Sequence, residues 1–138
     1  MVTHMISDED LIVAAKNARD NAYSCYSGYS VGAAIIDNDD KLHIGVNVEN
    51  VSYPLGNCAE AAAISAMVLS GGKNIKRIAI AGGKTNISSC MPCGGCRQRI
   101  FEFANKDTVI ITMNEDNEWE KNSIYELLPI GFDSHQLS

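Results

Sequence analysis

Hydrophobic residues recur along this chain in two spacings, one typical of helices and the other of strands. After Ser7 and three acidic residues that suit a first helical turn, apolar residues recur at helical spacing, which predicts a helix over residues 7–24. An alanine-rich stretch that closes on two glycines predicts a second helix over residues 57–70. Pro92 is a helix-start signal, and the apolar residues that follow predict a third helix over residues 93–104.

Short apolar runs bounded by polar turns predict the strands of a sheet. The turn "DNDD" joins the first two strands, and the later strands alternate with helices. This order predicts a three-layer α/β sandwich around one mixed sheet. Ser123 can cap a short helix that precedes a C-terminal tail. The predicted strands are residues 31–37, 41–50, 75–82 and 107–113, with a candidate fifth strand at residues 118–121.

Composition bounds the class of protein. The chain has 138 residues, of which 46% are hydrophobic and 20% charged, so we expect one domain over residues 1–138 with a single core. No apolar run approaches the ~18 residues of a transmembrane helix, and the start lacks signal-peptide features, which predicts a soluble cytoplasmic protein without membrane partners. A net charge of −6 disfavours nucleic acid as a partner, because that binding depends on Lys and Arg at the phosphates. A small uncharged substrate fits better.

Three cysteines fall at the predicted starts of two helices. Cys93 and Cys96 lie three residues apart on one helix face, and Cys58 begins the other helix. A helix start carries free backbone N–H groups and a positive dipole end, which favour thiolate over thiol. Three thiolates in the patterns C-x-E and P-C-x-x-C therefore predict a Zn²⁺ site with one open coordination position.

The cysteine pattern also allows other interpretations. Cys93 and Cys96 could form a redox pair, and Cys58 could be a buried core residue. Cys90 could close a four-cysteine structural zinc site, although it precedes Pro92 in a loop and is not on the helix face of the other two. Five cysteines are an odd number, which disfavours a disulfide framework.

Glu60 distinguishes a catalytic metal site from a structural one. A carboxylate beside three thiolates is electrostatically unfavourable, because like charges raise each other's pKa. If Glu60 faces the open position of the metal, it can take a proton from metal-bound water and deliver it to a substrate nitrogen. The alternative is an ordinary solvated glutamate in the first turn of a helix.

Motifs along most of the chain resemble one enzyme family. "CAE" and "PCGGCRQ" each open a predicted helix, and "YSGYSVGAAI", "GVNVENVSYPLGNCAE" and "ELLPIGF" match family segments in the same order between residues 19 and 132. On these motifs the chain resembles the zinc-dependent cytidine deaminases of the small homotetrameric type. The resemblance implies an α/β/α sandwich with a five-stranded mixed sheet, one Zn²⁺ per subunit, and active sites shared within a homotetramer.

The resemblance also implies roles for individual residues. Cys58, Cys93 and Cys96 bind zinc, and Glu60 is the catalytic proton shuttle. Substrate contacts are implied at five further positions: Asn47 and Glu49 at the ribose hydroxyls, Ala59 and Tyr29 at the base, and Phe132 reaching into a neighbour's site. An amide and a carboxylate two residues apart on a strand project from one face, which suits them to grip a sugar hydroxyl.

The implied reaction is hydrolytic deamination of cytidine and 2′-deoxycytidine to uridine and 2′-deoxyuridine, with release of ammonia, in pyrimidine salvage. Zinc-bound hydroxide attacks C4 of cytosine, while Glu60 donates a proton to ring N3 and then passes one to the departing amine. The runner-up is a deaminase of blasticidin S or another cytosine nucleoside. A structural-zinc or nucleoside-binding protein without catalysis is the non-enzyme alternative, and a nucleic-acid deaminase is disfavoured by the acidic charge.

Two departures from the family pattern bear on activity. Most members have Arg directly after "CAE", where it hydrogen-bonds the zinc-bound sulfurs, but this chain has Ala61. We expect helix dipoles and Arg97 to offset the thiolate charge instead, and Ala61→Arg to change the pH dependence of turnover. Tyr29 and Cys25 stand where the family motif has phenylalanine and proline, which predicts a more polar base pocket.

Overall fold

The structure, a computed structural model, describes residues 5–138 and contains one five-stranded sheet. Its elements are α1 (Asp8–Arg19), β1 (Ser30–Asp37), β2 (Leu42–Val46), η1 (Tyr53–Leu55), α2 (Ala59–Leu69), β3 (Ile75–Gly83), α3 (Gly94–Phe103), β4 (Val109–Met113), β5 (Trp119–Ser123), α4 (Ile124–Leu127) and η2 (Ser134–Leu137). The strand order is β2-β1-β3-β4-β5. Strands β3 and β4 are parallel and the other neighbouring pairs are antiparallel, so the sheet is mixed.

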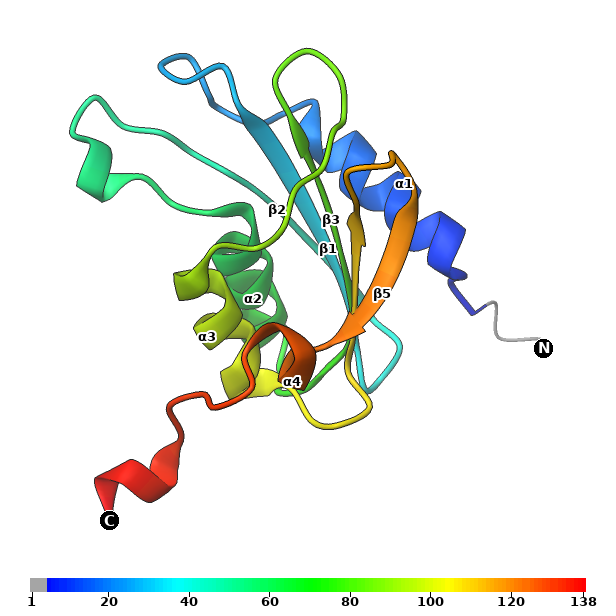
Figure 1. Cartoon of the computed structure of the whole chain (residues 1–138), viewed down its shortest axis with the longest axis vertical. Coiled ribbons are helices and arrows are strands. Elements are labelled where there is room, and N and C mark those ends of the chain that lie inside the picture. Colours follow the sequence, from blue (N-terminus) through cyan, green and yellow to red (C-terminus); the bar gives the residue numbers. More distant parts are fainter. Residues whose placement is uncertain (1–4) are drawn as a thin grey trace.

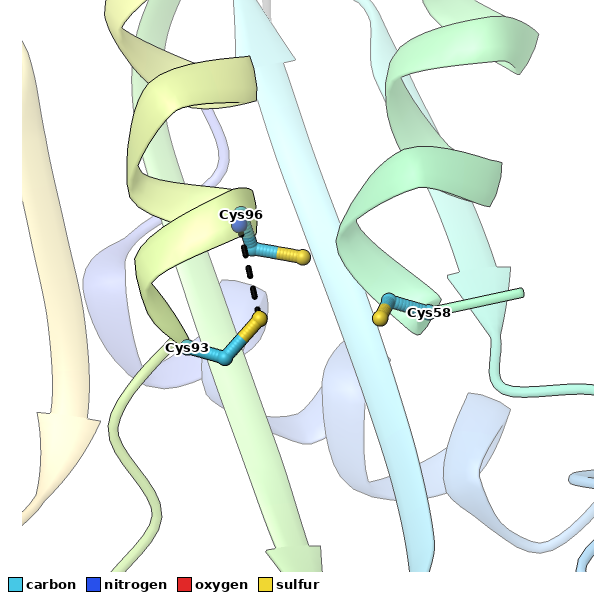
Figure 2. A group of neighbouring side chains, drawn as sticks. All are labelled: Cys58, Cys93 and Cys96. Atoms are coloured by element: carbon cyan, nitrogen blue, oxygen red, sulfur yellow. Dashed lines mark hydrogen bonds between the residues drawn. The ribbon is translucent and has the colours of Figure 1, made fainter. Parts of the chain in front are cut away.

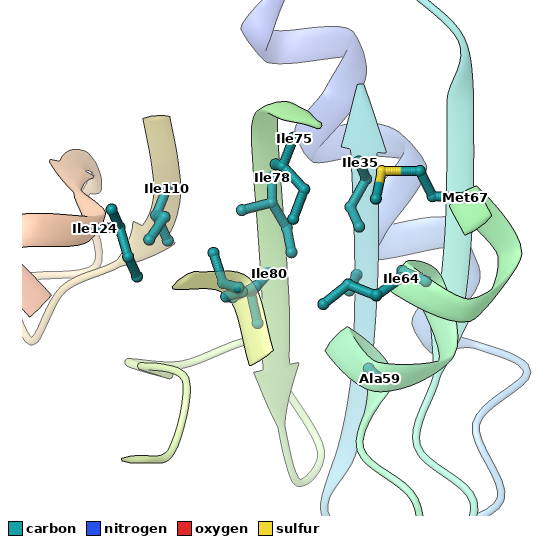
Figure 3. Close-up of a cluster of buried hydrophobic side chains, with 12 residues drawn as sticks. Ile35, Ala59, Ile64, Met67, Ile75, Ile78, Ile80, Ile110 and Ile124 are labelled. Carbon is teal, nitrogen blue, oxygen red and sulfur yellow. The ribbon is translucent and has the colours of Figure 1, made fainter. Parts of the chain in front are cut away.

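Helices cover both faces of this sheet (Figure 1). On one face α1 contributes Leu11 to a buried cluster that includes Ile36 of β1. On the other face α2 buries Met67 against Ile35 and its neighbours (Figure 3). Ile100 of α3 belongs to the same buried cluster. Adjacent residues of β1 thus point to opposite faces, as the two-residue period of a strand requires. The predicted three-layer α/β/α sandwich with a five-stranded mixed sheet is confirmed. Within residues 5–138, no helix has the length and apolar character needed to cross a bilayer.

The first helix is shorter than its sequence pattern predicts, since α1 ends at Arg19 and not near residue 24. The chain then turns so that the Tyr23 N–H donates to the Asn47 carbonyl at 3.0 Å, and the Glu49 N–H donates to the Tyr23 carbonyl at 2.8 Å. Tyr23 is therefore paired with the segment after β2, and its backbone is not available to continue the helix.

Strand β2 lies in direct contact with the start of α2. A Cβ atom built on Gly45 would be 2.3 Å from the Ala63 nitrogen and 2.6 Å from the Ala59 oxygen, which no side chain could tolerate. Glycine allows the helix backbone to rest on the strand backbone. Cys58 and Glu60 lie at this same end of α2, so this contact fixes the position of both.

The C-terminal segment leaves the body of the protein. Ser123 caps α4 as predicted, because its hydroxyl accepts from the Glu126 N–H at 3.2 Å while the Glu126 carboxylate accepts from the Ser123 N–H at 3.0 Å. Beyond α4 the chain runs outward to η2 (Figure 1).

Candidate active site

Three cysteine side chains converge between the N-termini of α2 and α3 (Figure 2). Cys58 is the N-cap residue of α2, Cys93 is the N-cap residue of α3, and Cys96 lies in the first turn of α3. Their Sγ atoms all lie within 4.8 Å of one another. The Cys93 sulfur accepts a hydrogen bond from the Cys96 N–H at 3.4 Å, so a free donor of the helix start already faces a sulfur.

This sulfur cluster fits one zinc ion. Zn–S bonds of ~2.3 Å in a tetrahedral arrangement place the sulfurs ~3.8 Å apart, so only a small closure is needed. Burial raises the pKa of the Cys58 thiol, and burial followed by the charges of Glu60 and Cys58 raises the pKa of Cys96. The backbone N–H of Cys96 lowers the pKa of Cys93. Three thiolates at this spacing repel one another, and a bound cation removes that cost.

Glu60 lies beside the sulfurs and is almost excluded from water. It occupies the first turn of α2 and is only 5% exposed. Burial raises the pKa of Glu60, and its own backbone N–H, the Cys96 thiol and the Arg99 guanidinium oppose this shift only in part. A raised pKa makes a carboxyl group a stronger base, which suits it to take up a proton and pass it on during a reaction. The alternative of a solvated glutamate is therefore wrong.

A cavity of about 470 Å³ opens next to Glu60 and the sulfurs. This volume falls within the ~300–1,000 Å³ typical of small-molecule sites. Burial, followed by the Cys90 thiol, raises the pKa of Tyr29 to about 12, so the Tyr29 hydroxyl is neutral and can donate a hydrogen bond. The predicted site residues that line this cavity are Tyr29, Asn47, Glu49, Cys58, Ala59, Glu60 and Cys93.

Asn47 and Glu49 are held by the loop that leads into β1 and by the start of that strand. The Asn47 side-chain oxygen accepts from the Val31 N–H at 2.8 Å, and its side-chain nitrogen donates to the Tyr29 carbonyl at 2.8 Å. The Glu49 carboxylate accepts from the Tyr26 and Ser27 N–H groups at 3.0 and 3.1 Å, and from the Ser27 hydroxyl. These bonds fix both side chains at the cavity wall before any ligand arrives. The predicted strand over residues 41–50 is too long, because β2 ends at Val46 and both residues lie in the segment after it, so these hydrogen bonds and not a strand's alternation set their direction.

Cys90 and Phe132 lie apart from the sulfur cluster. Cys90 lines the cavity, and its sulfur would be 2.6 Å from a Cβ on Gly82, but within residues 5–138 the sulfurs close enough to share a metal are those of Cys58, Cys93 and Cys96. A four-cysteine site is therefore not formed. Phe132 is 56% exposed on the C-terminal segment and borders a separate small cavity. Its entry into a neighbour's site stays a prediction.

Comparison with known proteins agrees with this geometry. Residues 5–112 match the family model described as the cytidine and deoxycytidylate deaminase zinc-binding region. The chain belongs to this deaminase family. Cytidine deaminase from Sporosarcina psychrophila is 37% identical over 130 residues, which cover 94% of each chain. The crystal structure of cytidine deaminase from Burkholderia pseudomallei is 38% identical, with a TM-score of 0.82 over 91% of this chain and 99% of the other. That of the Mycobacterium tuberculosis enzyme is 34% identical, with a TM-score of 0.79 over 92% and 98%.

The match confirms the family that the sequence motifs indicated, and with it zinc as the cofactor. A deaminase of this family needs a metal with an open position, and three sulfurs beside a buried acid provide that arrangement.

Arg97 does not contact the sulfurs of this deaminase, contrary to the sequence-based expectation. Its guanidinium donates to the Pro92 carbonyl at 2.9 Å and to the Leu127 carbonyl at 2.9 Å. Arg99 instead donates to the Cys96 sulfur at 3.6 Å, and this contact, together with the charges of the cysteines, raises the pKa of Arg99. The signal was present in the sequence, because Arg99 follows Cys96 by three residues and so shares its helix face.

Proposed function

We propose that this chain catalyses the hydrolytic deamination of cytidine and 2′-deoxycytidine, which yields uridine and 2′-deoxyuridine and releases ammonia. The observation that carries the proposal is the buried carboxyl group of Glu60, which borders three cysteine sulfurs and a cavity of about 470 Å³. A purely structural metal site gains nothing from a buried acid, because the acid adds negative charge. The named relatives are cytidine deaminases, which supports cytidine as the substrate.

Cys58, Cys93 and Cys96 hold the zinc ion in this proposal. When bound, zinc with an open coordination position activates a water molecule as a nucleophile near neutral pH. The chain contributes two helix N-termini, whose N–H groups and dipoles stabilise the sulfurs as thiolates.

Glu60 moves the protons. Its carboxylate accepts a proton from the attacking water, and the resulting carboxylic acid donates to ring N3 of cytosine. Once the water oxygen has bonded to C4, Glu60 takes the second proton from that oxygen and passes it to the amino nitrogen. The C4–N bond then breaks, ammonia leaves, and the oxygen becomes the C4 carbonyl of the product. The raised pKa of Glu60 supports both directions of transfer, and positioned general acid–base groups typically contribute ~10²–10⁴-fold to a rate.

Four residues of the cavity wall bind the nucleoside. Tyr29 and Ala59 contact the base, while Asn47 and Glu49 contact the ribose hydroxyls. An ionised carboxylate offers about four acceptor positions, and three donors of the loop already occupy positions on Glu49. A further position is thus available to a ribose hydroxyl, and the side chain needs no reordering to accept it.

The proposal extends to assembly and location: one domain over residues 1–138, a cytoplasmic homotetramer, and active sites that Phe132 of each chain shares with a neighbour. Large apolar side chains of the described residues lie in water in a single chain, which favours association. They include Val51, Tyr53, Leu55 and Ile130 at 75%, 72%, 71% and 92% exposure. Three thiols within 4.8 Å would oxidise readily outside a reducing compartment, which favours the cytoplasm.

The test of the activity combines a substrate panel with a single substitution. Loss of cytosine absorbance is followed with cytidine, 2′-deoxycytidine, 5-methylcytidine and blasticidin S, and zinc is determined on the same sample. Glu60→Gln is expected to lower kcat by at least ~10²-fold with zinc content unchanged, because the amide cannot carry a proton. Glu115→Gln, the same change at an exposed position, serves as the control and should leave kcat unchanged. Turnover of blasticidin S but not of cytidine, or equal turnover by Glu60→Gln, would contradict the proposal.

A further inference from the structure

Arg99 places a positive charge against the sulfur cluster from one helical turn beyond it. Its Nη1 atom donates to the Cys96 sulfur at 3.6 Å. A Cβ atom on Gly95 would lie 3.2 Å from the same Nη1 and 3.9 Å from the Cys93 sulfur. The guanidinium therefore lies over Gly95, the second of the two glycines between Cys93 and Cys96, in space that a side chain there would fill.

With zinc bound, the sulfur cluster would carry an excess of negative charge that a nearby cation can offset. Three thiolates and one Zn²⁺ carry a net charge of minus one, and an ionised Glu60 would add another. Within residues 5–138, Arg99 is the basic side chain that hydrogen-bonds one of these three sulfurs. Arg97, its neighbour, is engaged by the carbonyls of Pro92 and Leu127. Hydrogen bonds to ligand sulfurs from outside the coordination sphere set metal affinity as well as ligand geometry.

Positions 61 and 99 are related by the same spacing to a ligand cysteine. Ala61 follows Cys58 by three residues at the start of α2, and Arg99 follows Cys96 by three residues in the middle of α3. Helical side chains lean toward the N-terminus, so a long side chain at either position reaches back over the cysteine three residues earlier. Ala61 is half-buried and carries no charge.

We propose that Arg99 is a positioning residue that stabilises the zinc thiolates of this chain, in place of an arginine at position 61. It donates to Cys96, offsets the excess negative charge of the three thiolates, and so holds the metal. This inference rests on the zinc site of the proposed function.

The experiment measures the zinc dissociation constant by competition with a chromophoric chelator. Arg99→Gln, which keeps a long polar side chain but removes the charge, is expected to raise the constant ~10–100-fold, the usual effect of removing a partner of a metal ligand. Arg99→Lys should lose less, because the charge remains. The double variant Ala61→Arg with Arg99→Gln should recover at least about half of the loss on a logarithmic scale. Lys73→Ala, which removes one exposed positive charge beyond the far end of α2, is the matched control and should bind zinc as the unaltered chain does.

Each outcome bears on a separate statement. Equal zinc affinity of Arg99→Gln and the unaltered chain overturns the role of Arg99 and leaves the proposed deaminase intact. A loss that Lys73→Ala reproduces shows a general charge effect and also overturns it. If Arg99→Gln loses zinc affinity and Ala61→Arg restores it, the proposal is supported. If Ala61→Arg restores none of it, the statement that Arg99 acts in place of an arginine at position 61 is overturned. Absence of zinc binding by the unaltered chain overturns the proposed function itself. Absorbance of the Co²⁺-substituted protein reports thiolate ligation in every variant, independent of turnover.

Discussion

Gly45 controls how closely α2 approaches the sheet, and Gly45→Ala should therefore disturb the active site from a strand that does not line it. The added Cβ would lie 2.3 Å from the Ala63 nitrogen and 2.6 Å from the Ala59 oxygen, whereas ordinary contacts begin at 3.4 Å. The atoms in question belong to backbone, so no side chain can rotate away. Either α2 or the edge strand β2 has to move by about 1 Å to accept the methyl group.

Two measurable effects follow from a displacement of that size. Overpacking of a close-fitting contact lowers the free energy of unfolding by ~1–3 kcal/mol. A shift of ~1 Å between catalytic groups can cost ~10²-fold in rate, and here it would separate Cys58 and Glu60 on α2 from Cys93 and Cys96 on α3. We therefore expect kcat/KM for cytidine to fall ~10–100-fold, with weaker zinc binding.

The assays are urea denaturation at one fixed protein concentration and steady-state deamination with zinc in excess. Gly94→Ala is the matched control, because nothing lies within 4 Å of a Cβ at that position although it adjoins the ligand Cys93. That variant should keep its activity, and its stability should be unchanged or slightly higher since alanine favours a helix. If Gly45→Ala is as stable and as active as Gly94→Ala, the rigid strand–helix contact does not position the site.

Two further predictions concern polar groups outside the chemistry. Asp37 is 2% exposed; burial raises its pKa, but hydrogen bonds from His43 (2.7 Å) and from the N–H groups of Lys41 and Asp39 outweigh burial, so the pKa is lowered overall. The ionised Asp37 carboxylate therefore stabilises the fold fully above the unfolded-state pKa of ~4, and this stabilisation is lost as the pH falls through the lowered pKa of the folded state. Asp37→Asn should accordingly lower the free energy of unfolding by ~1.5–3 kcal/mol at pH 7 and by less at pH 3. Asn47→Ala should raise KM for cytidine ~10-fold or more while zinc content stays constant, because it removes the hydrogen bonds to Tyr29 and Val31 and the proposed ribose contact. An unchanged KM would show that neither matters.

Local sequence patterns predicted the order of the α-helices and strands and the three cysteines of the metal site, but not the short helices η1 and η2 or the end of β2 at Val46. Each ligand cysteine lies at an N-cap or in the first turn of a helix, and helix starts can be recognised from local sequence signals such as Pro92. The end of α1 could not be predicted in the same way. Its stop at Arg19 depends on Tyr23 pairing with Asn47 and Glu49, residues more than twenty positions away. A contact between residues so far apart in the sequence does not change the local spacing of apolar residues from which a helix is predicted.

The same limit explains what the sequence concealed about Asn47 and Glu49. Their spacing predicts that both side chains share a face, but their hydrogen bonds to the loop before β1 and to Val31 of β1 depend on how distant parts of the chain meet. The substrate contacts proposed for Asn47 and Glu49 use the same side chains as these contacts with the loop. The loop is therefore part of the candidate site even where it contributes only backbone groups.

Arg97 and Arg99 show how helical geometry decides between two residues that the sequence leaves side by side. Successive residues of an α-helix are rotated by about 100°, so the residue directly after Cys96 points away from its sulfur, whereas the third one returns to the same face. Arg97 accordingly donates to the carbonyls of Pro92 and Leu127 and so links the start of α3 to α4, whereas Arg99 donates to the Cys96 sulfur. The change at position 61 is then not an isolated loss of charge. On the proposal above, Arg99 in α3 replaces a cation at position 61 of α2, because each position follows a ligand cysteine by three residues.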